Sequence, residues 1–419
     1  MRYQAPRGTH DVLPGESDRW QRLERTFGDL AHQYGYREIR TPVFEDTDLF
    51  VRSSGETSDI VTKQMYTFRD KGDRSVTLKP EGTAPAIRSV IEHGLQQTGF
   101  INRLFYITPI FRYERPQKGR YRQSHQVGLE LIGSSAPSAD AEIIEITVRF
   151  FELLKISGIQ VLLNSLGRDE CRAKYREALL AFAAPFLQSQ SLEVRDRVAK
   201  NPLRLLDSKD PDTIAALTDA PFVSSFLEDD SRAHFESLQQ ILTDASVPYV
   251  LAPGIVRGLD YYTGTVFEVQ STSLGAQSSL CGGGRYDGLF NAMGGSPTPS
   301  VGVGIGIERA LIVMEAEGVS WDPVPFDLFV ASISASEHGR VLSLARELRK
   351  QGLSVVIDLE GKSLKSQIRH AERLGIKWVA ILGESEVQSS TVTMKDITKG
   401  EQQTVTQAGI KDFLKVPLP

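Results

Sequence analysis

Apolar side chains recur at helical spacing in the first long element of the chain, residues 17–34. Successive apolar positions there are separated by 3, 4, 3 and 4 residues, which predicts a single apolar stripe along a helix. The stripe consists of Trp20, Leu23, Phe27, Leu30 and Tyr34. Gly35 favours the end of the helix, and a short strand at 38–40 ends at Thr41 and Pro42. The pattern alone does not decide whether the stripe faces the chain's own core or another surface.

Strand patterns fill the middle of the chain and are interrupted once. The strand-like segments are 103–114, 127–132 and 157–164. A helical, charge-rich stretch then extends to about residue 247, and strand and glycine patterns resume at Tyr249. The helical stretch therefore looks inserted into a strand-containing unit. Strand, glycine turn and a final apolar helix occupy 257–317.

The pattern changes again after residues 322–325, where two prolines break regular structure and favour a linker. Beyond this point strands and helices alternate: strands are expected at 326–333, 353–359 and 378–382, and helices at 337–351 and 364–374. Units of this length predict a small α/β domain whose neighbouring strands are parallel. A hairpin around 398–400 and a short helix are expected to complete it.

Composition and charge narrow the class of protein. Of 419 residues, 40% are hydrophobic and 24% charged, as in an ordinary soluble protein, and no apolar run is long enough to span a membrane. The first ten residues lack the apolar run of a secretory signal, so a cytoplasmic location is expected. Two distant cysteines and seven scattered histidines predict neither a disulfide framework nor a zinc site. The net charge of −5 does not favour a nucleic-acid binder, although local charge matters more than the total.

The strand pair around residues 103–130 carries the first candidate site. Because side chains alternate along a strand, Arg112 and Glu114 are expected on one face. The returning strand presents on one face Ser124, Gln126, Gly128 and Glu130. If the two faces coincide, they form a polar binding floor, whereas the alternative is a solvent-exposed hairpin with ordinary surface charges.

The connection between these strands is basic. Within 112–122 the single acid Glu114 is outnumbered by the cations Arg112, Arg115, Lys118, Arg120 and Arg122. Such a loop suits the phosphates of a nucleotide or a nucleic acid. A solvated charged loop is the alternative, and no spacing rule excludes it.

Two glycine-containing segments are further candidates. In 257–264, adjacent tyrosines beside Arg257 combine aromatic walls with polar tips, although a turn with core aromatics would have the same pattern. In 302–309, alternating glycines permit close backbone approach, and Arg309 enters an apolar segment. A buried arginine needs an anionic partner, either Glu308 or a ligand phosphate.

In their order along the chain and in their amino-acid sequence, these segments resemble those of class II histidyl-tRNA synthetases over essentially the whole chain. The three signature segments of class II enzymes resemble residues 17–42, 111–132 and 302–309. The family's own histidine motif resembles 257–268, and its amino-acid-binding turn resembles 80–83.

The resemblance implies a fold and an activity. The fold is an α+β catalytic domain, residues 1–322, built on a mostly antiparallel sheet flanked by helices, with a helical insertion at about 168–245 and a C-terminal α/β anticodon-binding domain at 326–419. The implied enzyme is a homodimer, with 17–42 in its interface. It activates L-histidine with ATP to histidyl-adenylate and pyrophosphate, and then transfers histidine to the 3′ end of tRNA(His).

The resemblance also implies a histidine site. Glu81, Thr83 and Gln126 hold the α-amino and carboxylate end, while Glu130 and Tyr262 address the two ring nitrogens of imidazole. The residues assigned to histidine are Glu81, Thr83, Arg112, Gln126, Glu130, Arg257, Tyr261, Tyr262 and Tyr286.

The resemblance also implies that ATP is bound by Arg112, Glu114 and Arg309. Arg112 and Arg257 are the catalytic cations at the α-phosphate, Glu114 lies near the adenine amino group, and Arg309 lies by the γ-phosphate. Mg²⁺ is expected with the departing pyrophosphate, and its ligands are unknown. The tRNA acceptor end is expected to contact Gln117 and Arg122.

Ser124 departs from the family, which usually has a phenylalanine there that stacks on adenine. We therefore expect weaker ATP binding than in a Ser124→Phe variant. The departure also favours a rival, the synthetase-like, non-catalytic regulatory subunit of ATP phosphoribosyltransferase. Such subunits typically lack the anticodon domain and have eroded signatures, whereas Arg112, Arg257 and Arg309 are all present here. A sister synthetase for another amino acid is disfavoured by 257–262.

Overall fold

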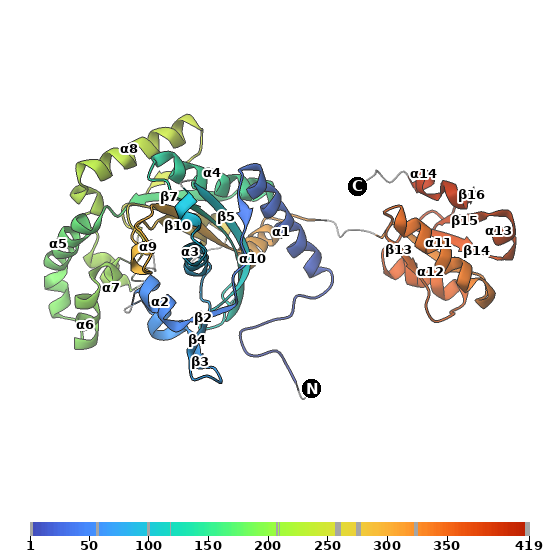
Figure 1. Cartoon of the computed structure of the whole chain (residues 1–419), viewed down its shortest axis with the longest axis horizontal. Coiled ribbons are helices and arrows are strands. Elements are labelled where there is room, and N and C mark those ends of the chain that lie inside the picture. The colour runs from blue at the N-terminus through green and yellow to red at the C-terminus, as the bar shows by residue number, and fades with distance from the viewer. Residues whose placement is uncertain are drawn as a thin grey trace. The chain divides into compact units, whose positions relative to one another are not determined.

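The computed structural model describes residues 3–55, 58–98, 101–117, 119–206, 208, 210–255, 261–273, 278–321 and 326–414. The chain divides into two compact units, Met1–Trp321 and Asp322–Pro419 (Figure 1). The linker predicted at 322–325 and the candidate residue Arg257 lie outside the described residues. Among those that are described, no helix is long and apolar enough to cross a membrane.

A large sheet forms the centre of the first unit, with the strand order β1-β5-β6-β11-β10-β9-β7-β8. Its strands are β1 (Arg37–Glu38), β5 (Asn102–Phe111), β6 (Gln123–Ile132), β7 (Ile159–Ser165), β8 (Val250–Leu251), β9 (Thr265–Ser271), β10 (Ser279–Arg285) and β11 (Ser300–Gly306). The pairs β1–β5 and β7–β8 at the two edges are parallel, and all pairs between them are antiparallel. The predicted mostly antiparallel sheet is confirmed.

Helix α1 (Glu16–Gln33) packs on this sheet and against α4 (Pro137–Leu153) and α10 (Ile307–Ala316). The apolar stripe of α1 is buried in one core with Val127 of β6, which settles the open question in favour of the chain's own core. Phe27 of α1 meets Phe105 of β5 edge to face, with ring centroids 6.0 Å apart. Each such buried side chain contributes roughly 1.5–3 kcal/mol relative to exposure.

The alternation along β6 separates this core from the candidate site. The side chains at Val127, Leu129 and Leu131 belong to the core with α1 and α4. Because neighbouring side chains point to opposite faces, Gln126 and Glu130 lie on the other face of the sheet. One strand therefore both anchors the helices and provides polar groups.

Smaller elements cover part of that other face. They are α2 (Thr47–Ser54), a π-helix (Ile60–Gln64), α3 (Thr83–Glu92), a 3₁₀-helix (Leu95–Thr98), α9 (Leu289–Ala292) and a second sheet of order β2-β4-β3, with β2 (Phe44–Asp46), β3 (Tyr66–Arg69) and β4 (Ser75–Leu78). Ile87 and Val90 of α3 share a second core with Tyr261, Tyr262 and Tyr286.

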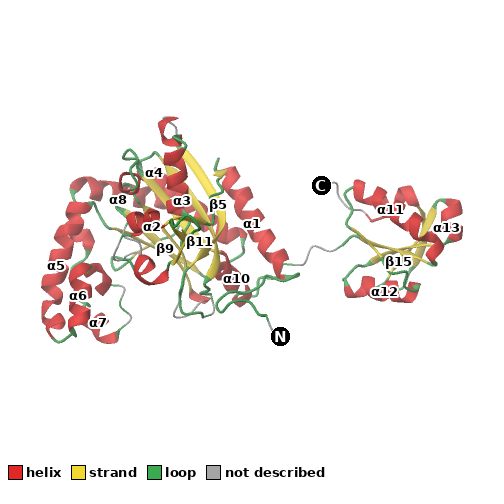
Figure 2. Ribbon diagram, turned by 60° about the horizontal axis from the view of Figure 1, so that its bottom comes forward, coloured by secondary structure: helices red, strands yellow, loops and turns green. Residues whose placement is uncertain are grey.

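Helices fill the stretch between β7 and β8, so the helical insertion expected from the charge-rich pattern is present. They are α5 (Asp169–Gln188), α6 (Leu192–Lys200), a 3₁₀-helix (Pro202–Leu205), α7 (Pro211–Ala216), a 3₁₀-helix (Val223–Phe226) and α8 (Asp229–Asp244). Helices α5, α6 and α7 gather on one side of the first unit in both ribbon views (Figures 1 and 2).

The second unit has a five-stranded sheet of order β13-β12-β14-β15-β16. Its elements are β12 (Leu328–Ser332), a 3₁₀-helix (Ala335–Glu337), α11 (His338–Lys350), β13 (Val355–Ile357), α12 (Leu364–Arg373), β14 (Trp378–Leu382), α13 (Glu384–Ser389), β15 (Thr391–Asp396), β16 (Gln402–Thr406), a 3₁₀-helix (Gln407–Gly409) and α14 (Ile410–Leu414). Helices α11 and α12 cover opposite faces (Figure 2). The parallel pairing expected here holds for β12, β13 and β14, and the expected hairpin is β15–β16, which pairs antiparallel.

Candidate active site

A cavity of about 500 Å³ lies over the polar face of β6 in the first unit. Its lining comes from the turn at 81–83, the β5–β6 hairpin, Tyr261 with Tyr262, Glu268 of β9, residues 279–282 of β10, and the junction of β11 with α10. Cavities of this size hold small-molecule ligands in many proteins. Segments widely separated in sequence therefore meet in one candidate site.

Glycines make room for the polar groups of this site. A Cβ atom at Gly302 of β11 would overlap the carboxylate of Glu130, and one at Gly304 would overlap the amide of Gln126. The alternation of glycines read from the sequence therefore has a steric reason. It allows β11 to pair closely with β6 while long polar side chains lie across it.

Glu130 is fully buried beneath this surface. Its carboxyl group accepts hydrogen bonds from Tyr106 Oη, at 3.1 Å, and from Tyr286 Oη. Burial raises the pKa of Glu130 to about 8, and the nearby Glu81 also raises it, while the phenol hydrogen bonds act in the opposite direction. The ring of Tyr286 lies 5.7 Å from that of Tyr261. An acid next to phenols thus forms one end of the site.

Glu81 caps the first turn of α3. Its carboxylate accepts the backbone N–H of Thr83 at 2.6 Å and that of Ala84 at 2.8 Å. Burial raises the pKa of Glu81, while these two bonds and the charge of Arg112 oppose the rise. The helix start therefore fixes Glu81 and Thr83 at the cavity wall.

Cations gather at the other end of the cavity. Arg112 donates from Nε to the carbonyl of Pro80 at 2.7 Å, and Arg309 donates from Nε to the carbonyl of Gly119 at 3.3 Å. Burial lowers the pKa of Arg309, and the positive charges of Arg120 and Arg112 lower it further. A cluster of cations around the half-buried Arg309 is suited to a polyanionic ligand. The carboxylate of Glu308 accepts the backbone N–H of His125 at 2.9 Å, so it has a partner other than its neighbour Arg309.

The predicted strand 103–114 is too long. Strand β5 ends at Phe111, and the chain turns where Glu114 N–H donates to the carbonyl of Arg112 at 2.7 Å. Arg112 and Glu114 both line the cavity, but from the hairpin connection and not from one face of a strand. Arg112 N–H still donates across the hairpin to the carbonyl of Arg122 at 2.9 Å, and the local turn at Glu114 ends the pairing beyond that bond.

Arg122 packs away from the cavity lining. Its guanidinium lies 3.9 Å from the ring centre of Tyr113, and its backbone N–H donates to the carbonyl of Gly8 at 2.7 Å. Gln117 and Arg120 form a tight turn through paired backbone bonds of 3.1 and 2.9 Å. The N-terminal segment around Gly8 thus supports the hairpin, a contact that sequence reasoning missed.

Most candidate residues that the structure describes meet in this cavity. The predicted residues that line it are Glu81, Thr83, Arg112, Glu114, Gln126, Tyr261, Tyr262 and Arg309. Glu130 and Tyr286 lie behind that lining and contact each other. Sequence reasoning missed Tyr106, whose ring fills the space left by Gly82 and Gly128. Those two glycines were the available signal.

Comparison with known proteins gives the family. The family model described as histidyl-tRNA synthetase matches residues 8–310, and the model of the anticodon-binding domain matches 327–416. The chain belongs to the histidyl-tRNA synthetase family. The histidine–tRNA ligase of Synechococcus elongatus is 45% identical over 97% of this chain and 93% of its own length. That of Acetivibrio thermocellus is 44% identical over 99% of this chain and 100% of its own.

Solved structures agree with membership of the histidyl-tRNA synthetase family. The apo histidyl-tRNA synthetase of S. aureus has a TM-score of 0.84 and 35% identity, covering 99% of this chain and 100% of that one. A Bacillus halodurans structure described as an ATP phosphoribosyltransferase regulatory subunit/histidyl-tRNA synthetase has a TM-score of 0.66 at 22% identity, covering 91% and 99%. The second likeness concerns the fold alone. The cavity has two chemically distinct ends, an acidic one with Glu81 and a cationic one with Arg112 and Arg309.

Proposed function

We propose that this chain is a histidine–tRNA ligase, which joins L-histidine to ATP to form histidyl-adenylate and pyrophosphate and then passes histidine to the 3′ end of tRNA(His). The observation that carries the proposal is the cavity itself. Its acidic, phenol-containing end and its arginine end share about 500 Å³. An amino acid and a triphosphate can therefore lie in contact within it.

We assign the acidic end to histidine. Glu81, Thr83 and Gln126 would hold the α-amino and carboxylate groups, while Glu130 and Tyr262 would address the ring nitrogens. Acceptor and phenol partners fix an imidazole tautomer. The complete set proposed for histidine is Glu81, Thr83, Arg112, Gln126, Glu130, Arg257, Tyr261, Tyr262 and Tyr286.

The arginine end would bind ATP. Arg112 and Arg257 would meet the α-phosphate, Arg309 the γ-phosphate, and Glu114 the adenine amino group. A magnesium ion on the triphosphate would supply further positive charge, and Glu268 is a carboxylate of the lining that could hold it. One or two carboxylates together with phosphate oxygens suit this ion.

The chemistry requires little from the protein beyond position and fixed charge. The histidine carboxylate attacks the α-phosphorus, the bond to pyrophosphate breaks, and negative charge grows on the non-bridging oxygens. Cations held before the reaction, such as Arg112, stabilise that charge without having to reorganise. Orienting the two substrates in one cavity removes much of the entropic barrier.

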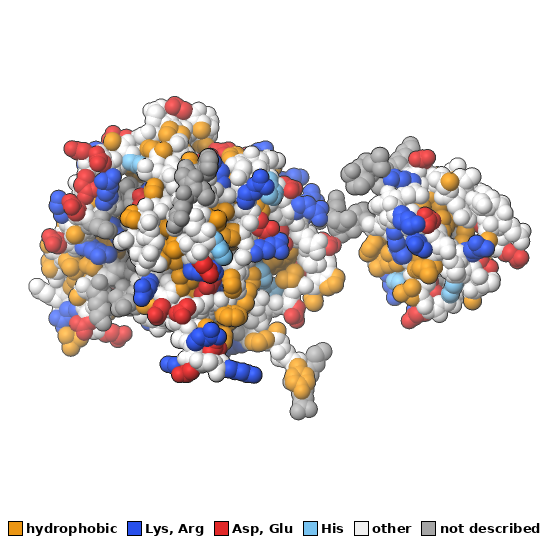
Figure 3. Space-filling model, viewed as in Figure 1, with side chains coloured by type: hydrophobic (Ala, Val, Ile, Leu, Met, Phe, Trp, Pro, Cys, Tyr) orange, Lys and Arg blue, Asp and Glu red, His pale blue; other side chains and the backbone are white. Residues whose placement is uncertain are grey.

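For tRNA, we propose residues 326–419 as the anticodon-binding domain, Gln117 and Arg122 as contacts to the acceptor end, and 1–322 as the catalytic domain, with its insertion at about 168–245. Acidic and basic side chains are interspersed on the face of the first unit shown in Figure 3, so RNA would be met by local groups and not by one basic field.

We also propose a homodimer in the cytoplasm. The apolar side chains of Val43 and Phe44 are 42% and 51% exposed, next to the segment 17–42 predicted to form the interface. Their exposure supports dimer formation. Sedimentation velocity would measure the oligomeric state.

ATP–pyrophosphate exchange with each of the twenty amino acids tests the activity. We expect exchange with histidine and at least about 10⁴-fold less efficient exchange with phenylalanine, which would leave buried polar groups unpaired. Exchange with a different amino acid would overturn the assignment of the acidic end. If no amino acid supports exchange, the result would favour the rival hypothesis of a non-catalytic regulatory subunit of ATP phosphoribosyltransferase.

Ser124 provides a test of the adenine site. Its Oγ donates to the carbonyl of Tyr121 at 3.3 Å, and both residues line the cavity. We expect Ser124→Phe to lower the KM for ATP about fivefold or more, because an aromatic ring can stack on adenine. The KM for histidine should stay unchanged, and Ser124→Ala is the control that removes the hydroxyl without adding a ring. Equal KM values for ATP in Ser124→Phe and the natural protein would contradict the prediction.

A further inference from the structure

We infer that Arg172 and His234 are positioning residues through which the two ends of the helical insertion fix the tyrosine walls of the histidine pocket. The inference rests on the proposed function, because it concerns how the site for histidine is shaped. Arg172 belongs to α5, the first helix of the insertion, and His234 to α8, the last.

The first connection runs from α5 to Tyr262. Arg172 donates from Nη1 to the backbone carbonyl of Tyr262 at 3.1 Å. The chain just before α5 holds the same loop, since Leu166 N–H donates to the carbonyl of Gly264 at 2.7 Å and Gly264 N–H donates to that of Gly167 at 2.9 Å. The loop that carries Tyr262 is therefore bonded to the start of the insertion.

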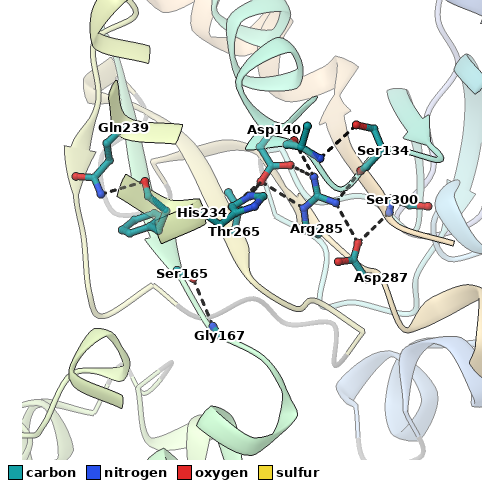
Figure 4. A network of polar contacts seen from close by, with 12 residues as sticks. Ser134, Asp140, Ser165, Gly167, His234, Gln239, Thr265, Arg285, Asp287 and Ser300 are labelled. Atoms are coloured by element: carbon teal, nitrogen blue, oxygen red, sulfur yellow. Dashed lines mark hydrogen bonds and ion pairs between the residues drawn. The ribbon is translucent and has the colours of Figure 1, made fainter. Parts of the chain in front are cut away.

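The second connection runs from α8 through Asp140 of α4 to the neighbour of Tyr286. His234 Nε2 lies 2.8 Å from Asp140 Oδ2, and Asp140 is fully buried. The same carboxylate accepts the hydroxyl of Thr265 at 2.7 Å and the guanidinium of Arg285 (Figure 4). Arg285 directly precedes Tyr286 in the chain, so the position of Arg285 constrains the backbone position of Tyr286.

The two connections meet where the segment that carries Tyr262 is hydrogen-bonded to the segment that carries Tyr286. The carbonyl of Arg285 accepts the N–H of Thr263 at 2.7 Å, and the hydroxyl of Thr263 accepts the N–H of Asp287 at 3.2 Å. Burial acts to raise the pKa of Asp140, but the bond from His234 and the charge of Arg285 outweigh it, and the pKa lies below its usual value. A buried carboxylate that stays charged depends on all of these partners.

Packing links the insertion to the same walls. Tyr175 and Leu179 of α5 belong to one apolar core with Tyr261, Tyr262 and Tyr286. The arginine end of the cavity is instead built from the β5–β6 hairpin and α10. A displacement of α5 or α8 should therefore change the histidine pocket more than the ATP pocket.

The experiment compares KM values for histidine and ATP in pyrophosphate exchange. We expect Arg172→Ala and His234→Ala each to raise the KM for histidine about 5- to 10-fold, the range for loss of one hydrogen bond, with the KM for ATP unchanged. Arg172→Lys and His234→Gln keep a donor and should recover part of the loss. These conservative variants also keep the test valid where an alanine variant does not fold.

Arg168→Ala is the matched control. Arg168 is an exposed arginine at the start of α5, 3.7 Å from Asp230 of α8, and this ion pair is within the insertion. We expect both KM values to stay at the natural level in this variant. Equal rises in both KM values, or folded alanine variants with the natural KM for histidine, would overturn the inference. Absence of histidine-dependent exchange in the natural protein would instead overturn the proposed function.

Discussion

Replacing Arg112 by glutamine should lower kcat/KM of histidine-dependent pyrophosphate exchange by about 10²–10³, the loss that follows removal of one fixed group facing developing charge. Arg112 is held by a bond of 2.7 Å from Nε to the carbonyl of Pro80, so its guanidinium is oriented before substrates bind. A neutral amide of similar length keeps some hydrogen-bonding capacity and loses the charge. The fall should appear mainly in kcat, because charge on the α-phosphate grows towards the transition state.

The matched control is Arg115→Gln in the same hairpin. Arg115 is exposed, and the part of the hairpin that lines the cavity does not include it. Its loss should change kcat/KM by no more than about twofold, as for most surface substitutions. If Arg112→Gln retained activity within tenfold of the natural protein while folding normally, the cation at the α-phosphate would have to be another residue.

The sequence predicted elements with regular periodicity well. The helix predicted at 17–34 from the apolar stripe matches α1 to within one residue at each end, and the alternation in the second unit predicted the parallel strands β12, β13 and β14. Periodicity succeeds there because burial of one face is what selects the element. The stripe could not reveal its partner, since the same spacing suits a core and an interface.

Predictions from local sequence pattern failed where tertiary contacts determine the structure. Glu114 was expected on a strand, but the turn bond from its N–H to the carbonyl of Arg112 places it in the hairpin connection. Tyr106 and Asp140 were not predicted because an aromatic in a strand and an acid in a helix are ordinary in sequence. Their importance comes from neighbours distant along the chain, Glu130 for Tyr106 and Arg285 for Asp140.

The residues of the candidate site were recognised through the family resemblance more than through pattern. Composition, spacing and charge left each segment with a structural alternative, and only the order of the segments removed the ambiguity. The structure adds what neither source could give. It shows that Glu130 is enclosed by the phenols of Tyr106 and Tyr286, with a pKa raised to about 8 by burial.

That raised pKa leads to the second large effect, on the binding of histidine. Near pH 7 the Glu130 carboxyl of the free protein is mostly protonated, and it must lose its proton to accept an imidazole N–H. We therefore expect the KM for histidine to fall about fivefold between pH 7 and pH 8 and by about a further twofold above pH 8, as expected for a single group with this pKa. This window lies above the ordinary imidazole pKa, so free histidine changes little across it.

Glu130→Gln should remove the pH dependence and raise the KM for histidine about 10- to 100-fold at pH 8, because a bond to a charged acceptor is replaced by one to an amide. The KM for ATP, measured in the same assays, is the internal control and should not change. A thermal melt followed by circular dichroism would show that the variant folds. A natural protein whose KM for histidine is the same at pH 7 and pH 8 would mean that Glu130 is already ionised before histidine arrives. An unchanged KM in a folded Glu130→Gln variant would remove Glu130 from the imidazole site, because a buried acceptor in contact with the ring cannot be replaced without cost to binding.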